Sequence, residues 1–233
     1  MELSKAALER QIKTVNGEHL IRREGQLQLY EGAAEFQAAW PSWQTRKAHG
    51  VKFELLESPE AIAKIQPGID PRFTHAGFTP EWKNVVHPKT WTEHLANAFT
   101  EMGGEIECHQ VDAIAPQTDH VVVFTEGHCF QGRQLVIAAG AWSKQLASQL
   151  GDNVPLDTER GYNTTLPAGA FELKTHITFS NHGFVVTKMG DGVRIGGAVE
   201  LGGLSLAPNY QRSKILLDKA AKFLPGLKTE HGE

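Results

Sequence analysis

Cysteine is scarce in the 233-residue chain, which has only Cys108 and Cys129. Two cysteines are too few for a disulfide framework, and they fit a reducing compartment, where such residues are usually small and buried. Long hydrophobic runs are missing too, because the longest, Leu135 to Trp142, is far shorter than the roughly 20 residues that cross a bilayer. The first residues, MELSKAALERQI, have no apolar stretch typical of a signal peptide. We expect a cytoplasmic protein, with peripheral attachment to the inner membrane as the alternative.

Clusters of positive charge are also missing. The net charge is −4 at pH 7, and the lysines and arginines are scattered singly along the chain. Nucleic acid binding depends on basic side chains that together neutralise several backbone phosphates. We therefore expect no nucleic acid partner.

No stretch has both the spacing and the context of a dinucleotide-binding glycine loop. The nearest candidate, GDGVRIGG at residues 190–197, has the spacing G-x-G-x-x-x-G. Such a loop must lead directly into a helix whose N-terminus holds the pyrophosphate. The segment that follows is rich in glycine and ends at Pro208, so it cannot form that helix. We predict a hairpin here, with Asp191 and Gly192 in a turn of positive φ values.

Metal and hydrolase chemistry have little support. The pairs Cys108-His109 and His128-Cys129 are adjacent residues, which point to opposite faces of a strand and lack the usual ligand spacing. No G-x-S-x-G nucleophile elbow occurs, and Ser143 lies at the start of a predicted helix. We predict no metal site and no nucleophilic hydrolase.

Helices and strands are predicted to interleave along the chain. From apolar spacing and from start and stop signals, helices are expected over residues 2–14, 33–49, from the Ser58 N-cap to Pro67, 88–102, 142–150 and 210–223. Pro41 should kink or divide the second of these helices. The intervening segments, among them EIECHQVDAI, HVVVFTE and VPLDTERGYNTTL, are expected to form strands. This alternation predicts an α/β (α+β) protein.

The stretch LVIAAGAW, residues 135–142, has the composition of a buried strand that ends in a tight turn. Apolar side chains on both faces are typical of a strand in a parallel sheet covered by helices. An ending in Ala-Ala-Gly lets a ligand approach the backbone closely, because no large side chain stands in the way. The alternative is a tightly packed corner between a strand and a helix.

Arg160, Tyr162 and Arg194 are the polar residues with the pattern of a binding site. The stretch ERGY places a cation and a phenol two residues apart, on one face of a strand, which suits a carboxylate substrate. An ordinary ion pair or an edge-strand charge is the alternative interpretation. No acid or base for catalysis is predicted.

Taken in order, several segments resemble the FAD-dependent oxidoreductases of the D-amino acid oxidase superfamily, in particular the small-subunit type of D-amino acid dehydrogenase. The similar segments are LIRREGQLQLY, HPKTWTEHLANAFTEMGGEIECHQVDAI, LVIAAGAWSKQLASQLGDNVPLDTERGY, GFVVTKMGDGVRIGGAVELGGL and APNYQRSKILLDKAAKFLPGL. They cover nearly the whole chain in the family's order. The run from Leu135 to Tyr162 is the most specific.

The resemblance implies a division into three parts. Residues 1–84 would form the first part of a substrate domain, residues 85–152 the second part of the FAD-binding domain, and residues 153–233 the rest of the substrate domain with a closing helix. The expected fold is thus a partial FAD/NAD(P)-binding Rossmann-like layer and an antiparallel-sheet substrate domain with flanking helices.

The resemblance also assigns roles to individual residues. On the cofactor side it implies that five residues lie close to FAD: Val111, Ala138, Ala139, Gly140 and Trp142. On the substrate side it implies four residues: Arg160, Tyr162, Met189 and Arg194. At three positions the sequence departs from the family's usual residue, which affects the substrate preference: Asn163 in place of His, Lys188 in place of Pro, and Ala198 in place of Thr.

The resemblance further implies oxidative deamination of a D-amino acid or related amine, in which FAD accepts a hydride from the α-carbon. The electrons would pass to a quinone or to oxygen. The family's N-terminal G-x-G-x-x-G unit and its C-terminal Gly-x-Arg-Pro segment have no counterpart in the 233 residues. We therefore expect an internal piece of a flavoenzyme that cannot hold FAD tightly alone. The alternative is a non-catalytic substrate-domain remnant or binding module without a cofactor, which would work beside a separate FAD-binding chain.

Overall fold

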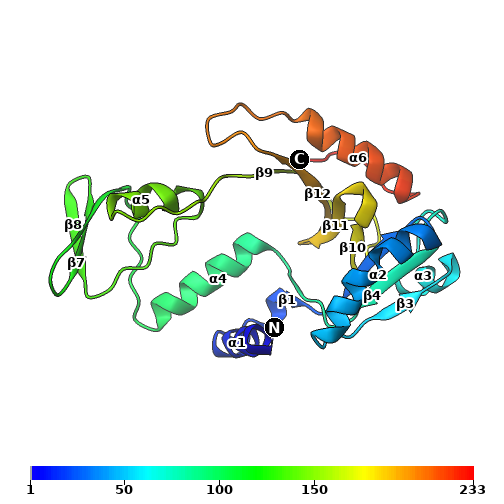
Figure 1. Ribbon diagram of the computed structural model, residues 1–233, viewed down its shortest axis with the longest axis horizontal. Helices are drawn as coiled ribbons and strands as arrows, with labels where there is room; N and C mark the ends of the chain where they lie inside the picture. Colours follow the sequence, from blue (N-terminus) through cyan, green and yellow to red (C-terminus); the bar gives the residue numbers. More distant parts are fainter. Residues whose placement is uncertain (1) are drawn as a thin grey trace. The chain divides into compact units, whose positions relative to one another are not determined.

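The computed structural model describes residues 2–233, which form two compact units. Unit 1 contains Met1–Met102, Gly161–Val199 and Pro208–Glu233. Unit 2 contains Gly103–Arg160 and Glu200–Ala207. The chain therefore leaves unit 1 and returns to it twice, as the sequence of colours in Figure 1 shows.

A seven-stranded sheet forms the centre of unit 1. In spatial order its strands are β3 (Glu54–Leu56), β4 (His75–Thr79), β2 (Gln26–Tyr30), β10 (His176–Phe179), β11 (Phe184–Met189), β12 (Gly192–Glu200) and β9 (Arg160–Leu166). Strand β10 runs parallel to β2, whereas β4 is antiparallel to β2 and β11 is antiparallel to β10. The sheet is therefore mixed and not antiparallel throughout, because its two sequence segments meet at a parallel pair. A separate two-stranded sheet joins β1 (Ile21–Arg22) to β5 (Asn84–Val85).

The helices of unit 1 confirm the sequence prediction. They are α1 (Glu2–Thr14), α2 (Ala33–Ala48), α3 (Pro59–Ile65), α4 (Pro88–Glu101) and α6 (Gln211–Phe223), with short 3-10 turns η1 (Glu18–Leu20) and η3 (Ser180–His182). Helix α2 is one continuous helix, and the carbonyl of Pro41 accepts a hydrogen bond from the Thr45 hydroxyl at 3.0 Å. The Ser58 hydroxyl caps α3 by accepting from the Ala61 N–H at 3.2 Å. Gly103, with φ +91°, follows the end of α4.

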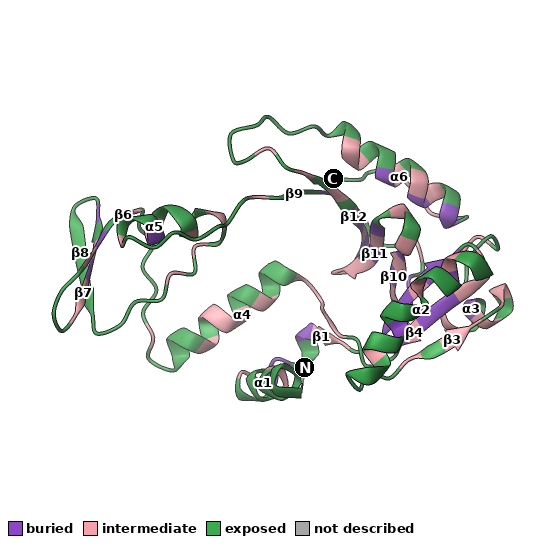
Figure 2. Ribbon diagram, in the orientation of Figure 1, coloured by how far each residue is buried: buried purple, intermediate pink, exposed green. Residues whose placement is uncertain are grey.

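The main core of unit 1 lies between the sheet and helix α6. Leu27, Ile177 and Ile195 point into it from three strands and are fully buried. Helix α6 adds Ala220 and Phe223 from its covered side. Figure 2 shows that buried residues gather on the sheet of unit 1. Alternating side chains on the strands and helical spacing on α6 therefore produce one continuous apolar layer.

A second core packs helix α2 against strand β2. Trp43 is fully buried, and its indole N–H donates to the Tyr30 hydroxyl at 2.7 Å. Burial raises the pKa of Tyr30. The indole ring lies so close to Gly77 of β4 that a Cβ atom there would be 2.1 Å from it. Only glycine therefore fits beneath this tryptophan.

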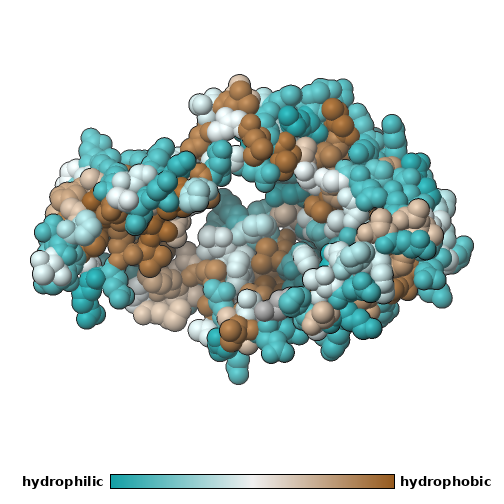
Figure 3. Space-filling model, in the orientation of Figure 1, coloured by the Kyte–Doolittle hydropathy of each residue, from teal (hydrophilic) through white to brown (hydrophobic). Residues whose placement is uncertain are grey.

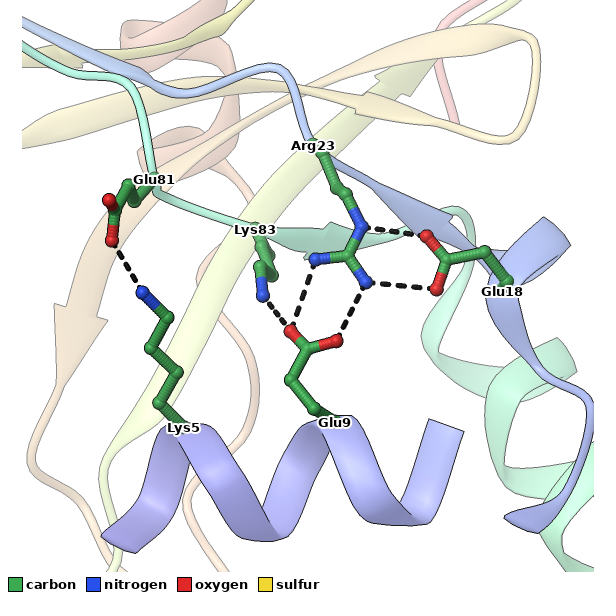
Figure 4. A network of polar contacts seen from close by, with 6 residues as sticks. All are labelled: Lys5, Glu9, Glu18, Arg23, Glu81 and Lys83. Carbon is green, nitrogen blue, oxygen red and sulfur yellow. Dashed lines mark hydrogen bonds and ion pairs between the residues drawn. The ribbon is translucent and has the colours of Figure 1, made fainter. Parts of the chain in front are cut away.

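Helix α1 is attached mainly by ion pairs. Figure 4 shows that Lys5 reaches Glu81, while Glu9 contacts both Arg23 and Lys83. The Lys5–Glu81 distance is 2.6 Å, and the Arg23–Glu9 distance is 3.0 Å. Ile12 is the one buried side chain of the helix as described. Helix α1 is therefore attached by several ion pairs at its exposed surface and by one buried apolar side chain.

Unit 2 consists of a three-stranded antiparallel sheet and a short helix. The strands are β6 (Val111–Pro116), β7 (Val121–Thr125) and β8 (His128–Gly132), followed by the 3-10 turn η2 (Gly140–Trp142) and helix α5 (Ser143–Gln149). In the part of the chain that the structure describes, the buried hydrophobic side chains of unit 2 are Ile114, Val122 and Ala147. Its core is therefore small.

The predicted strand at residues 135–140 is wrong. The chain has no strand between β8 and η2, and Val136 is 84% exposed. A central parallel strand needs a neighbour on each side, and no described strand pairs with this segment. Figure 3 shows hydrophobic side chains gathered near α5, on the face of unit 2 turned toward the viewer. The apolar composition is thus present without the partners that would turn it into a strand.

Four smaller predictions also need correction. The segment EIECHQ is not a strand, because β6 begins at Val111, and the strand predicted from residue 154 begins at Arg160. Cys108 and Cys129 are both exposed and not buried. The β11–β12 turn consists of Gly190 and Asp191, since Met189 pairs with Gly192, and only Gly190 has a positive φ of 56°. Glycine at the first turn position suits a type II′ hairpin.

Candidate functional site

The segment from Ala138 to Gly140 has an open backbone. Gly140 has φ +54°, and a Cβ atom built on it would meet nothing within 4 Å. Ala138 is exposed, and Trp142, which ends the turn η2 just before α5, is 58% exposed. The glycine is therefore required by the backbone conformation and not by crowding, and a ligand can reach this backbone. The packed-corner alternative does not fit this exposure.

Val111 begins β6 in the same unit. It pairs with Thr125 of β7, and the register shifts between Val111 and Ala113. A shift of this kind is a β-bulge, which bends a strand at the edge of a sheet. The Gln149 side chain of α5 bridges the bulge, because it donates to the Asp112 carbonyl and accepts from the Ile114 N–H, each at 3.1 Å. Helix α5 is thereby fixed to β6.

Arg160 has its charge satisfied inside unit 2. One guanidinium nitrogen lies 3.4 Å from the Glu200 carboxylate, and the other donates to the Leu206 carbonyl at 2.5 Å. The Glu200 side chain is 11% exposed and that of Arg160 is 26% exposed. These contacts hold the segment 200–207 against the start of β9. The ion-pair alternative of the sequence analysis is therefore present in the structure.

Tyr162 lies in β9 and is 5% exposed. Its hydroxyl accepts a hydrogen bond from the Asn209 N–H at 2.7 Å, and the ring of Tyr210 stands edge-on at 6.4 Å. This contact fixes the chain just before helix α6. Tyr162 shares a strand face with Arg160, as predicted, because the two residues are two positions apart.

Arg194 and Met189 lie together on the opposite face of the sheet. Arg194 pairs with Thr187 across β11 and β12, and its Nε donates to the Thr165 hydroxyl at 2.9 Å. Met189 is two residues from Thr187 on the same strand and so points to the same side. Tyr162 lies on the other face from Thr165, since three positions separate them in β9. The structure therefore brings together Arg194 with Met189, and Arg160 with Tyr162, but not the two pairs with each other.

One set of polar residues was missed by the sequence analysis. Arg22, Lys174 and Lys188 come from three distant segments and line one pocket of about 350 Å³ at the β11–β12 turn. No local motif joins them, because only the tertiary fold brings β1, which belongs to the two-stranded sheet, close to β11 and the loop before β10 of the mixed sheet. Only knowledge of the strand order could have found this pocket.

A family model described as "FAD dependent oxidoreductase" (DAO) matches residues 1–232 of the chain. The chain belongs to this family. A D-amino-acid oxidase from Bradyrhizobium diazoefficiens is 30% identical over 209 residues, which cover 89% of this chain and 49% of that protein. A D-amino acid dehydrogenase from Paramagnetospirillum magneticum is 28% identical over 210 residues, covering 86% of this chain and 49% of that protein. The chain thus spans about half the length of these curated relatives.

Solved structures confirm the mixed α/β fold. Glycine oxidase from Bacillus cereus matches with a TM-score of 0.84 and 19% identity, and the match covers 100% of this chain and 65% of that one. L-proline dehydrogenase from P. horikoshii matches with a TM-score of 0.81 and 19% identity, covering 96% of this chain and 62% of that one. The mixed sheet of unit 1 and the antiparallel sheet of unit 2 are therefore an arrangement found in this family.

Membrane-spanning helices and metal-binding groups are both missing from the described residues. Within residues 2–233, no helix has the length and hydrophobicity that a membrane crossing requires. Across the same residues, His, Cys, Asp and Glu side chains do not gather in a group of three or more that could hold a metal ion. His109 and His128 approach each other, with ring centroids 5.0 Å apart, and Glu107 lies 3.5 Å from His109, but within residues 2–233 these side chains do not form a group that could hold a metal ion.

Proposed function

We propose that this chain is part of a cytoplasmic flavoenzyme that oxidatively deaminates a D-amino acid or related amine. The observation that carries the proposal is the family match over residues 1–232, together with curated relatives that are named D-amino-acid oxidase and D-amino acid dehydrogenase. In this chemistry FAD supplies the hydride acceptor, and the protein orients the amine and excludes water. A quinone or oxygen would take the electrons.

On this proposal residues 85–152 belong to the FAD-binding domain and residues 1–84 and 153–233 to the substrate domain. The open backbone at Ala138, Ala139 and Gly140, with Val111 and Trp142, would line the cofactor. Arg160 and Tyr162, or Arg194 and Met189 on the other sheet face, would line the substrate side. A free guanidinium would suit a substrate carboxylate, so Arg160 would have to exchange its Glu200 partner to serve this role.

The residues described here fit FAD only in part. Its pyrophosphate is usually held by free N–H groups at a helix N-terminus. Helix α5 follows the open segment but has seven residues and no side-chain cap, with Trp142 at its N-cap position. We therefore propose that residues 2–233 alone do not retain FAD. One observation favours the non-catalytic alternative: residues 134–139, which would line the cofactor, pair with no described strand.

The deciding experiment expresses the chain together with any in-frame coding sequence on either side. An extended chain that retains FAD through gel filtration and reduces a dye with D-alanine, but not with L-alanine, would support the proposal. Retention of FAD with turnover of L-alanine or L-proline only would contradict the D-amino acid assignment. If the coding sequence adds no residues, the same assay is run on the chain with excess FAD, where absence of turnover supports the non-catalytic alternative. Stoichiometric flavin absorbance in the isolated chain would contradict the proposed inability to retain FAD.

A further inference from the structure

We propose that the pocket at the β11–β12 turn of unit 1 binds a free α-amino acid or a similar small zwitterion. The pocket has a volume of about 350 Å³ and is open to solvent on one side. Pockets for small molecules begin at about 300 Å³. A ligand the size of an amino acid therefore fits in this volume.

The walls of the pocket are fixed before any ligand binds. Gln66 is completely buried, and its amide oxygen accepts from the Lys174 N–H at 2.7 Å while its nitrogen donates to the Glu172 carbonyl at 3.1 Å. On the opposite wall the Gly190 N–H donates to the Val86 carbonyl at 2.9 Å. Both the loop before β10 and the turn after β11 are thus held by buried or backbone groups, which reduces the cost of ordering them around a ligand.

Arg22 provides the fixed cation of the pocket. One terminal nitrogen donates to the Gly190 carbonyl at 2.5 Å, and the other lies 3.9 Å from Glu24. Glu24 is closer to Lys188, at 2.5 Å, so the charge of Glu24 is largely matched by that lysine. The guanidinium therefore retains hydrogen-bonding capacity for a carboxylate.

The remaining charges distinguish a zwitterion from a simple anion. Lys174, Glu172 and Asp191 line the pocket, are exposed, and make no ion pair within 4.0 Å across residues 2–233. With Arg22 they provide two cations and two anions that are not neutralised by each other. A ligand with only a carboxylate would be repelled by the two acidic side chains. A ligand with only an ammonium group would be repelled by the two basic side chains. A molecule with a carboxylate and an ammonium group a few ångströms apart satisfies both signs.

The apolar part of the wall suits the side chain of such a ligand. Leu173 and Val193 are buried beneath the pocket, and Phe171 packs partly against the main core. The pocket is also distinct from the face that carries Arg160 and Tyr162. Gly196 lies beside Tyr162 and is four residues further along β12 than Gly192, which is about 13 Å for an extended strand. The inference does not depend on FAD or on turnover, and it adds an amino acid site to the one in the proposed function.

The test is calorimetric titration of the 233-residue chain with glycine and with D-alanine, in the absence of FAD. The variants are Lys174→Gln and Asp191→Asn, which change exposed side chains and leave Gln66 and Arg22 in place. The matched controls are Lys144→Gln and Asp152→Asn in unit 2. Arg160→Gln separates this pocket from the proposed substrate face, and thermal melting of every variant verifies folding.

We expect one saturable site per chain. Loss of one charge-assisted contact should weaken binding at least about tenfold in Lys174→Gln and in Asp191→Asn. The two controls and Arg160→Gln should stay within about twofold. Acetate and methylamine, which each carry one of the two charges, should bind at least about tenfold more weakly than glycine. Three results would overturn the inference: no saturable binding, binding that only Arg160→Gln weakens, or acetate binding as well as glycine.

Discussion

Gln66 shows how one buried side chain can shape a binding wall far from its own helix. It follows α3 and is completely buried, and its amide donates to the neighbouring Pro67 carbonyl and also contacts residues 172–174. A buried amide is stable only when its donor and acceptor are both satisfied. Two of its three partners are backbone groups of one loop, so the glutamine fixes the spacing of that loop.

We predict that Gln66→Leu destabilises the protein by about 1–3 kcal/mol, because the Lys174 N–H and the Glu172 carbonyl lose their partner at part-buried contacts. The free energy of unfolding is to be measured by urea denaturation. Gln117→Leu, at an exposed position in unit 2, is the matched control and should change it by less than about 0.5 kcal/mol. Equal effects of the two substitutions would show that the Gln66 contacts contribute nothing of their own.

Among the elements, helix α1 contacts the rest of unit 1 through several ion pairs, one of which joins Lys5 to Glu81. Contacts with Lys5 and Lys52 hold the pKa of the Glu81 carboxyl at about 2, well below its usual range. Because the pKa is lower in the folded state, the contact stabilises α1 above about pH 4.5 and is lost as the pH falls toward 2. Glu81 is fully exposed, so salt also screens the contact.

We expect hydrogen exchange of the α1 amides to accelerate between pH 4.5 and 2, relative to the amides of α2, and also on adding 1 M salt at pH 6. Glu81→Gln should accelerate the exchange of α1 at pH 6 and reduce the additional effect of salt, while the contacts of Glu9 with Arg23 and Lys83 keep part of it. Glu126→Gln, a substitution at an exposed turn of unit 2, is the control and should leave α1 unchanged. Exchange in α1 that ignores both salt and Glu81→Gln would show that Ile12 alone holds the helix.

The sequence predicts an element well when the signals that determine it lie within the element itself. Helices α2, α3 and α4 carry their own apolar spacing and end signals, so they could be located without the fold, and Pro41 does not divide α2. The segment 135–139 carries a strand composition, but a strand exists only with a hydrogen-bonding neighbour, and that information lies elsewhere. Arg160 was predicted as polar and important, but its pairing with Glu200 joins residues 40 apart and has no local signal.

For the chain as a whole, stability should be very unevenly distributed between the two units. Unit 1 has large buried clusters with several aromatic side chains, whereas the described part of unit 2 buries three hydrophobic side chains. Local opening free energies follow the buried apolar contacts. We predict that most amides of β6, β7 and β8 exchange at least about tenfold faster than those of β2 and β10 under the same conditions. Equal protection of the two sheets in hydrogen exchange measured by mass spectrometry would contradict this.

Val136 gives the sharpest test of what the apolar segment does in a larger assembly. In the chain as described it is 84% exposed, so Val136→Ser should change the free energy of unfolding by less than about 0.5 kcal/mol. Val122→Ser, at a position 8% exposed in β7, is the matched control and should cost about 1–3 kcal/mol. If further polypeptide turns residues 135–139 into a covered strand, Val136→Ser should become as costly as Val122→Ser, because the same side chain is then buried. A large cost of Val136→Ser in the 233-residue chain alone would mean that its own residues already cover the segment in solution.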